Sequence, residues 1–235
     1  MAGISGMEVK RMFQPLIDEC KLRNYSPRTI KLYLYYNRRF LCYVKKKPQE
    51  VTQNDIRKYL LLMIAKHRSS STVNLIHNAL NFYYNMIMKR RFYNIPYQKR
   101  EKKIKVAASK NEIRKMIAVT KNIKHKLIIS LLYASGVRRA ELVKIKVNDL
   151  DFSRNILLVR QGKGNKDRHT ILSNTVINQI HHYLIKRPYR SKYLFASKDG
   201  HITTSTVEAV IKQARRKARV KTRITPHTLR HSFAT

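Results

Sequence analysis

Three short clusters in the second half of the chain carry side chains that could converge on one phosphate group. Arg138 and Glu141 are one helical turn apart, so the carboxylate can orient the basic group. Lys163 stands between two glycines, in a turn from which its ammonium can project. His227 and Arg230 share one face at the start of a predicted helix, a position that favours anions. Two arginines can grip phosphate oxygens bidentately, and Lys163 or His227 could supply protons.

The first two clusters also have other interpretations. Arg138 and Glu141 by themselves would make an ordinary salt bridge on a helix. Lys166 and Arg168 follow Lys163 closely and compete for its role.

A metal site is a further alternative for the third cluster. His227 and His231 are four residues apart, the spacing of a metal-binding pair on a helix. No glutamate completes an HExxH pattern and the sequence offers no third ligand, so we predict no metal site.

The charge balance indicates the kind of partner. The 235 residues include 51 Lys plus Arg and 13 Asp plus Glu, which gives a formal net charge of +38 at pH 7. Such an excess is typical of proteins that bind nucleic acid. A hydrophobic content of 43% excludes a disordered basic tail. The longest nearly apolar stretch, 127–137, has about half the length of a membrane helix, and no signal-peptide core is present. We therefore expect a soluble intracellular protein without a membrane partner.

The elements that position the clusters fall into two predicted domains. Apolar residues recur at helical spacing over 8–90, which predicts a small bundle of four helices. Cys20 and Cys42 lie inside these helical patterns and are expected to be reduced core thiols. The expected start signals of the last three helices are Ser26 before Pro27, Thr52 with Asp55, and Ser71 or Thr72.

The basic stretch 91–108 has no hydrophobic periodicity and predicts an interdomain linker. Ser109 and Glu112 then form a capping box that opens the second domain, 109–235. The pattern changes to that of strands at 156–159 and 169–172, on either side of a tight glycine turn, and a third strand at 193–195 can join them. Helices are expected at 174–186 and 206–218, with a last one from Pro226. The predicted fold class is mainly α with a small antiparallel β-sheet.

Taken together and in this order, the clusters resemble the tyrosine recombinase family, which includes phage integrases and Xer-type resolvases. The motifs are Arg-x-x-Glu-Leu at 138–142, Gly-Lys-Gly-Asn-Lys-Asp-Arg at 162–168 and Pro-His-Thr-Leu-Arg-His-Ser-Phe-Ala-Thr at 226–235. The resemblance covers about 8–235. It implies a helical core-binding, SAM-like domain and a mixed α/β catalytic domain that form a C-shaped clamp on DNA.

The resemblance also implies an activity: site-specific DNA recombination or integration through a 3′-phosphotyrosine intermediate, without metal or nucleotide cofactor. Arg138 and Arg230 would clamp the scissile phosphate, with Glu141 as the supporting carboxylate. Lys163 would be the general acid for the leaving 5′ oxygen, and His227 the acid/base histidine. The sequence has no room for the extra N-terminal arm-binding domain of many integrases, which favours a simpler Xer-like enzyme.

The family's nucleophilic tyrosine lies beyond the His-x-x-Arg box, whereas all 14 tyrosines of this sequence lie at or before Tyr193. We therefore expect this chain to be truncated before the nucleophile and to bind DNA without cleaving it covalently. The complete enzyme would assemble as a tetrameric synapse, which is doubtful for this chain. The alternative is a noncatalytic DNA-binding protein on a recombinase scaffold.

The expected partner is a double-stranded DNA recombination site, and the expected location is the cytoplasm, at the nucleoid. The residues expected to contact DNA are polar or basic side chains outside the apolar stripes: Arg28, Lys31, Thr72, Asn74, His77, Asn78, Lys166 and Arg168. The aromatic run 82–84 is interpreted as core rather than as a platform for stacked bases.

Overall fold

The computed structural model of the chain describes residues 11–90, 92, 95–99, 107–160, 167–188, 190–198 and 200–233. The chain divides into two compact units, unit 1 (Met1–Lys103) and unit 2 (Ile104–Thr235). No helix within the described ranges is long and apolar enough to cross a membrane.

Unit 1 is helical. Its elements are α2 (Gln14–Leu22), α3 (Pro27–Val44), the short η1 (Pro48–Glu50), α4 (Gln53–Ala65), α5 (Ser70–Asn81) and the π-helical turn η2 (Phe82–Ile87). The predicted caps of α3 and α4 are confirmed, since the Ser26 and Thr52 side chains accept backbone hydrogen bonds at 3.2 and 3.3 Å. The predicted start of α5 was wrong by two to three residues. Ser69 is its N-cap, because its hydroxyl accepts from the Thr72 backbone at 3.3 Å.

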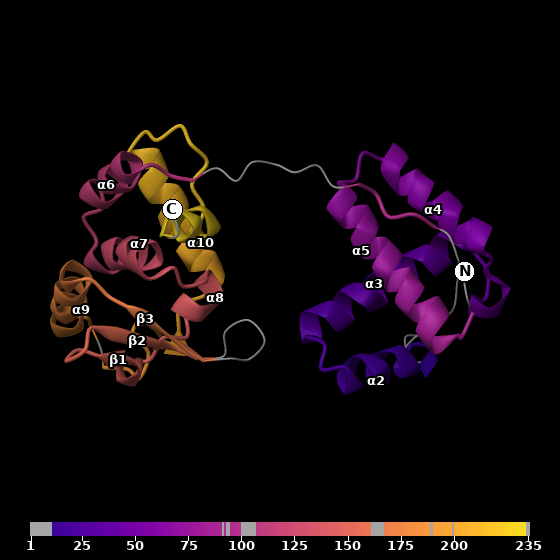
Figure 1. Cartoon of the computed structure of the whole chain (residues 1–235), viewed down its shortest axis with the longest axis horizontal. Helices are drawn as coiled ribbons and strands as arrows, with labels where there is room; N and C mark the ends of the chain where they lie inside the picture. The colour runs from indigo at the N-terminus through magenta and orange to yellow at the C-terminus, as the bar shows by residue number, and fades with distance from the viewer. Residues whose placement is uncertain are drawn as a thin grey trace. The chain divides into compact units, whose positions relative to one another are not determined.

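Aromatic side chains fill the core of unit 1. Phe40 of α3 lies edge-on to Tyr59 and Tyr84, with ring centroids 5.2 and 6.0 Å apart. The run 82–84 is buried, as predicted, and α5 packs along α3 (Figure 1). Cys20 is buried too, but Cys42 is exposed, so the prediction of a core thiol was wrong there. Cys42 lies beside the apolar stripe of α3 rather than in it.

A segment that follows η2 returns along α5. The Asn74 amide donates to the Gln98 carbonyl and accepts from the Gln98 backbone N–H, both at 2.9 Å. Tyr97 donates its hydroxyl to Asn78 at 2.8 Å, and its ring lies 4.3 Å from the His77 ring. Residues 95–98, which belong to the expected linker 91–108, are therefore part of unit 1 and pack against α5. Residues 100–106 lie outside the described residues.

Within its described residues, unit 2 combines helices with two small antiparallel sheets. Its helical elements are α6 (Lys110–Ala118), α7 (Ile123–Ser135), α8 (Arg139–Leu142), η3 (Val147–Asp149), α9 (Asn174–Lys186), α10 (Thr204–Lys217) and α11 (Pro226–Phe233). One sheet has the order β1 (Leu150–Asp151), β2 (Ile156–Val159) and β3 (Arg168–Ile171), and the other pairs β4 (Ala196–Ser197) with β5 (Gly200–His201).

The predicted hairpin is confirmed, with Val159 opposite Arg168. The predicted third strand was wrong, because β1 fills that position. Tyr193 makes only an isolated bridge to Lys146. The β1 strand is two residues long, which is too short to give an alternating pattern in the sequence.

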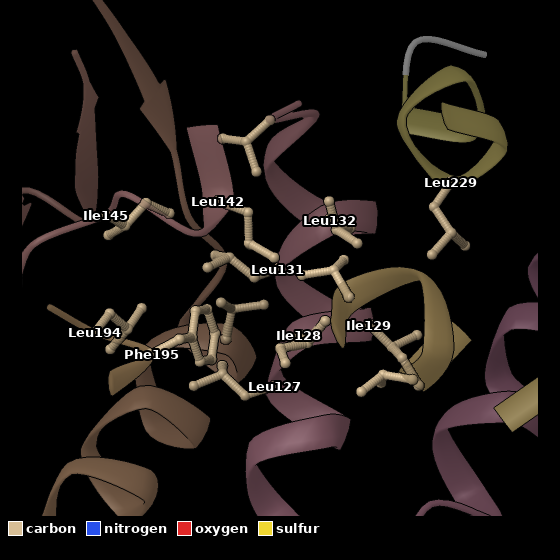
Figure 2. Packing of buried hydrophobic residues seen from close by; sticks show 14 of the residues in the cluster. Leu127, Ile128, Ile129, Leu131, Leu132, Leu142, Ile145, Leu194, Phe195 and Leu229 are labelled. Carbon is tan, nitrogen blue, oxygen red and sulfur yellow. The ribbon is translucent and has the colours of Figure 1, made fainter. Parts of the chain in front are cut away.

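Helix α7 is the centre of unit 2. Leu127, Ile128, Ile129, Leu131 and Leu132 are all fully buried, as expected for a helix that is apolar on all sides. Figure 2 shows them between Leu194 and Phe195 on one side and Leu229 of α11 on the other. In Figure 1, α9 and the three-stranded sheet lie on one side of α7 and α6 on the other.

The turn after α7 sets the start of the first cluster. Gly136 is the C-cap in the left-handed conformation, with φ +58°. A Cβ at this position would lie 2.5 Å from the Phe233 ring of α11. The turn leads directly into α8. The packing of α7 and α11 around Gly136 therefore fixes the position of Arg138, the N-cap of α8.

Candidate active site

Arg138 and Glu141 cap the short helix α8 together. The Arg138 backbone N–H donates to Glu141 Oε2 at 2.7 Å, and its Nη1 donates to Oε1 at 2.6 Å. The Glu141 side chain is 6% exposed and that of Arg138 is 38% exposed. The buried carboxylate therefore holds a guanidinium that remains open to solvent.

Arg168, the first residue of β3, binds the same carboxylate from the other side. Its Nη1 and Nη2 donate to Glu141 Oε1 and Oε2 at 3.1 and 2.8 Å, a bidentate pair. Burial raises the pKa of Glu141, but the hydrogen bonds from Arg168 and Arg138 outweigh burial and lower the pKa to about 2. Glu141 is ionised at neutral pH and joins α8 to the sheet.

Arg230 of α11 completes the group of arginines. Its Nη1 lies 3.8 Å from Glu141 Oε2, beyond hydrogen-bond distance. This nitrogen is buried and has no hydrogen-bond partner among the described residues. Burial and the neighbouring charge of Arg138 lower the pKa of Arg230 from its ordinary value. Three guanidinium groups thus surround one carboxylate, which leaves an excess of positive charge at this place.

His227 and His231 lie one turn apart on α11. Their Nε2 atoms are 2.9 Å apart, so the N–H of one ring donates a hydrogen bond to the ring nitrogen of the other. Within the described ranges, no three His, Cys, Asp or Glu side chains are grouped so that they could hold a metal ion.

Arg138, Arg230 and the two histidines line one groove in unit 2. Its volume is about 710 Å³, and its walls come from α8, α10, α11 and the residues that directly precede α8 and α11. The lining residues are Arg138, Arg139, Ala140, Glu208, Thr225, Pro226, His227, Arg230 and His231. The groove is the size of a small-ligand site, and its guanidinium groups suit a phosphate.

Two groove residues were not predicted from the sequence. Arg139 and Glu208 form an ion pair at the groove, with side chains 44% and 51% exposed. Arg139 was detectable, since it adjoins Arg138. Glu208 had no signal, because it reaches the site from α10, far along the chain.

The first and third predicted clusters meet in space: Arg138, His227 and Arg230 share the groove. Lys163 and Lys166 lie outside the described residues. Arg168 was predicted to contact DNA; its guanidinium is paired with Glu141 and its side chain is 34% exposed, and the DNA contact stays a prediction.

The predicted DNA contacts of unit 1 lie on two helices, α3 and α5. Arg28 and Lys31 are exposed on α3, as a contact residue must be. Asn74 and His77 are 4% and 7% exposed beneath the segment 95–98, so the prediction that they face a groove was wrong. Asn78 is bound to the Tyr97 hydroxyl. Thr72 is half-buried, and its hydroxyl lies 2.9 Å from the Ser69 cap hydroxyl.

Comparison with known proteins gives matches over both units. The model of the phage integrase family matches residues 107–235, and that of the phage integrase N-terminal SAM-like domain matches residues 12–93. Tyrosine recombinase XerA of Pyrococcus horikoshii is 33% identical over 220 residues, which cover 92% of this chain and 75% of the relative.

Two solved structures are similar as well. The crystal structure of XerA recombinase is 31% identical with a TM-score of 0.52, over 97% of this chain and 83% of that one. A lambda integrase dimer bound to a COC′ core site is 16% identical and has the same fold, with a TM-score of 0.74 over 95% of this chain and 87% of that one.

Proposed function

Because the chain belongs to the phage integrase family of tyrosine recombinases, we propose that it binds duplex DNA and that Arg138 and Arg230 hold the scissile phosphate during site-specific strand exchange. The observation that supports this most is the groove in unit 2, where Arg138, His227 and Arg230 meet from distant parts of the sequence. A purely structural salt bridge would not need a second arginine whose Nη1 is buried without a hydrogen-bond partner among the described residues.

The two arginines act on the nonbridging oxygens of the phosphate. Their charge stabilises the extra negative charge that develops on these oxygens when the strand is attacked. Glu141 keeps Arg138 in place through its backbone and side-chain hydrogen bonds. The guanidinium groups supply the charge that a metal ion supplies in other phosphoryl-transfer sites, so the proposed chemistry needs neither metal nor other cofactor.

Proton transfer falls to the remaining candidates. His227 lines the groove and is hydrogen-bonded to His231, and it is proposed as the acid/base histidine beside the phosphate. Lys163 is proposed as the general acid that protonates the leaving 5′ oxygen. Its role follows from its place in the motif at 162–168.

The nucleophile of the proposed reaction is a tyrosine that forms a 3′-phosphotyrosine link. All 14 tyrosines of this sequence lie at or before Tyr193, before α11. Incubation with a nicked suicide substrate tests for this intermediate, since its product is a covalent protein–DNA adduct.

Duplex DNA is the proposed partner of both units. Unit 1 contributes exposed cations such as Arg28 and Lys31, which attract the phosphate backbone without reading its sequence. An oligomeric synapse on paired recombination sites and a location at the nucleoid follow from this function. Fluorescence of a tagged chain that is spread evenly through the cell would contradict the location.

Binding to a short duplex, measured by fluorescence anisotropy, tests the role of the arginines. Arg138→Ala combined with Arg230→Ala should weaken binding by more than tenfold, since charged hydrogen bonds contribute about 1.5–3 kcal/mol each. Arg154→Ala is the control, because this side chain is 77% exposed and outside the groove. Equal affinity of the double variant and the control would overturn the proposal.

A further inference from the structure

The four hydrogen-bond positions of the Glu141 carboxylate are all occupied. Oε1 accepts from Arg138 Nη1 at 2.6 Å and from Arg168 Nη1 at 3.1 Å. Oε2 accepts from the Arg138 backbone at 2.7 Å and from Arg168 Nη2 at 2.8 Å. An ionised carboxylate offers about four lone-pair sites, so none is left for another donor.

Arg230 is the cation that this arrangement leaves out. Its Nη1 lies 3.8 Å from Glu141 Oε2 and is buried without a hydrogen-bond partner among the described residues. A buried donor without a partner costs free energy, so Arg230 gains from any acceptor that comes within reach. The carboxylate is saturated and none of the described residues accepts from this nitrogen, so a ligand in the groove can be that acceptor.

We propose that Arg168 is a positioning residue that occupies Glu141 and thereby keeps the Arg230 guanidinium available for a phosphate. The inference rests on the proposed function, since the phosphate is that of bound DNA. Without the Arg168 fork, Glu141 has two open acceptor positions and Arg230 lies close enough to take them. Arg230 would then be neutralised by an internal ion pair, and phosphate would have to compete with it.

The place of Arg168 in the fold suits this role. It is the first residue of β3 and lies opposite Val159 of β2. The same strand is tied to the end of α7 by Thr170, whose hydroxyl donates to the Ser135 carbonyl at 3.1 Å. The guanidinium therefore approaches Glu141 from a fixed sheet, and its 34% exposure leaves it less open to solvent than Arg138.

The hairpin provides a matched control. Arg160, which directly follows β2, pairs with the buried Asp149 at 2.6 Å and makes no contact with Glu141 among the described contacts. Arg168→Lys and Arg160→Lys each keep the charge and each lose an arginine–carboxylate contact. Only the first removes the bidentate fork from Glu141, because a lysine cannot reproduce it.

Binding of the 235-residue chain to a short duplex is measured for Arg168→Lys with and without Arg230→Ala. We expect roughly tenfold weaker binding with Arg230 present, the scale of one charged hydrogen bond. With Arg230→Ala already in place, Arg168→Lys should cause no further loss, and Arg160→Lys should change little in either background. If Arg168→Lys weakens duplex binding equally in both backgrounds, Arg168 contacts DNA directly and the inference is overturned. Unchanged duplex binding in both backgrounds also overturns it.

Two further measurements do not depend on DNA. Arginine side-chain NMR of the free protein should show a shifted Arg230 Nε–H resonance in Arg168→Lys, and no such shift when Glu141→Gln is added. An unchanged Arg230 resonance in Arg168→Lys overturns the inference, even where duplex binding fails altogether. If Arg168→Lys does not fold, Arg168→Met is measured in its place with the same expected outcomes. Failure of the proposed function would appear separately, as equal duplex binding by the unchanged chain and by the Arg138→Ala, Arg230→Ala variant.

Discussion

Arg138 and Glu141 are joined twice, through the Arg138 backbone N–H at 2.7 Å and through its Nη1 at 2.6 Å. The backbone bond caps α8, and the side-chain bond orients a guanidinium in the groove. One buried carboxylate therefore serves the local fold and the candidate phosphate site together. Its ionisation should be visible in the stability of the protein.

Stability should fall in acid through Glu141. Its pKa is about 2 in the folded protein, below the ordinary value of 4.5. A lowered folded-state pKa stabilises the fold above pH 4.5, and this stabilisation is lost as the pH falls toward 2. The contribution is on the order of 3 kcal/mol.

Urea denaturation of the unchanged chain and of Glu141→Gln as a function of pH measures this contribution. The difference between the two should shrink between pH 4.5 and 2, because the other carboxylates titrate alike in both. A difference that stays constant with pH would contradict the assignment.

Gly136→Ala should destabilise unit 2. The residue has φ +58°, and its new Cβ would lie 2.5 Å from the Phe233 ring. The left-handed conformation alone costs a residue with a Cβ about 1–2 kcal/mol. Thermal unfolding of Gly136→Ala with and without Phe233→Ala separates the backbone strain at residue 136 from the collision of the new Cβ with the Phe233 ring. The second change should recover part of the loss, and no recovery would show that the ring moves aside at no cost.

Asn74→Ala should release the segment 95–98 from α5. The Asn74 side chain makes both hydrogen bonds to the Gln98 backbone, and its loss leaves buried groups unpaired at a cost of about 1–3 kcal/mol. Hydrogen exchange at the Gln98 amide should become much faster. Asn54→Ala, an exposed position on α4, is the control. Unchanged protection of Gln98 would mean that Asn74 does not hold the segment.

Replacing Arg28 and Lys31 by alanine should weaken DNA binding through charge alone. Each phosphate contact contributes about 0.9 to the slope of log affinity against log salt, so the slope should become less steep by nearly 2. Titrations of a short duplex at several salt concentrations measure it. Thr72→Ala changes no charge and is the control, which should leave the slope as it is. An unchanged slope for the double variant would mean that Arg28 and Lys31 do not contact DNA.

Local signals made much of the fold predictable. Ser26, Thr52 and Ser109 act as N-caps where the sequence placed them, since a cap depends on residues three positions away. The hairpin was predictable for a similar reason, because two runs of strand-forming residues flank one turn. Arg138 and Arg230 were identified from their motifs, and the groove joins them.

Contacts between distant segments were not predictable in the same way. The face of α5 that carries Asn74 and His77 looks polar in the sequence, but the segment 95–98 covers it. Arg168 was assigned to DNA because nothing local showed its partner, which is Glu141 on another element. A buried ion pair of this kind is set by the tertiary fold rather than by spacing along the chain.

In the proposed function, Arg138 and Arg230 hold one phosphate of bound DNA. The most direct measurement replaces single phosphates by neutral methylphosphonates in a duplex that the 235-residue chain has selected from a random pool. We expect one phosphate at which this change weakens DNA binding by the unchanged chain about tenfold or more. At that phosphate, binding by the Arg138→Ala, Arg230→Ala variant should weaken no further. Equal sensitivity of the chain and the variant at every phosphate would contradict it.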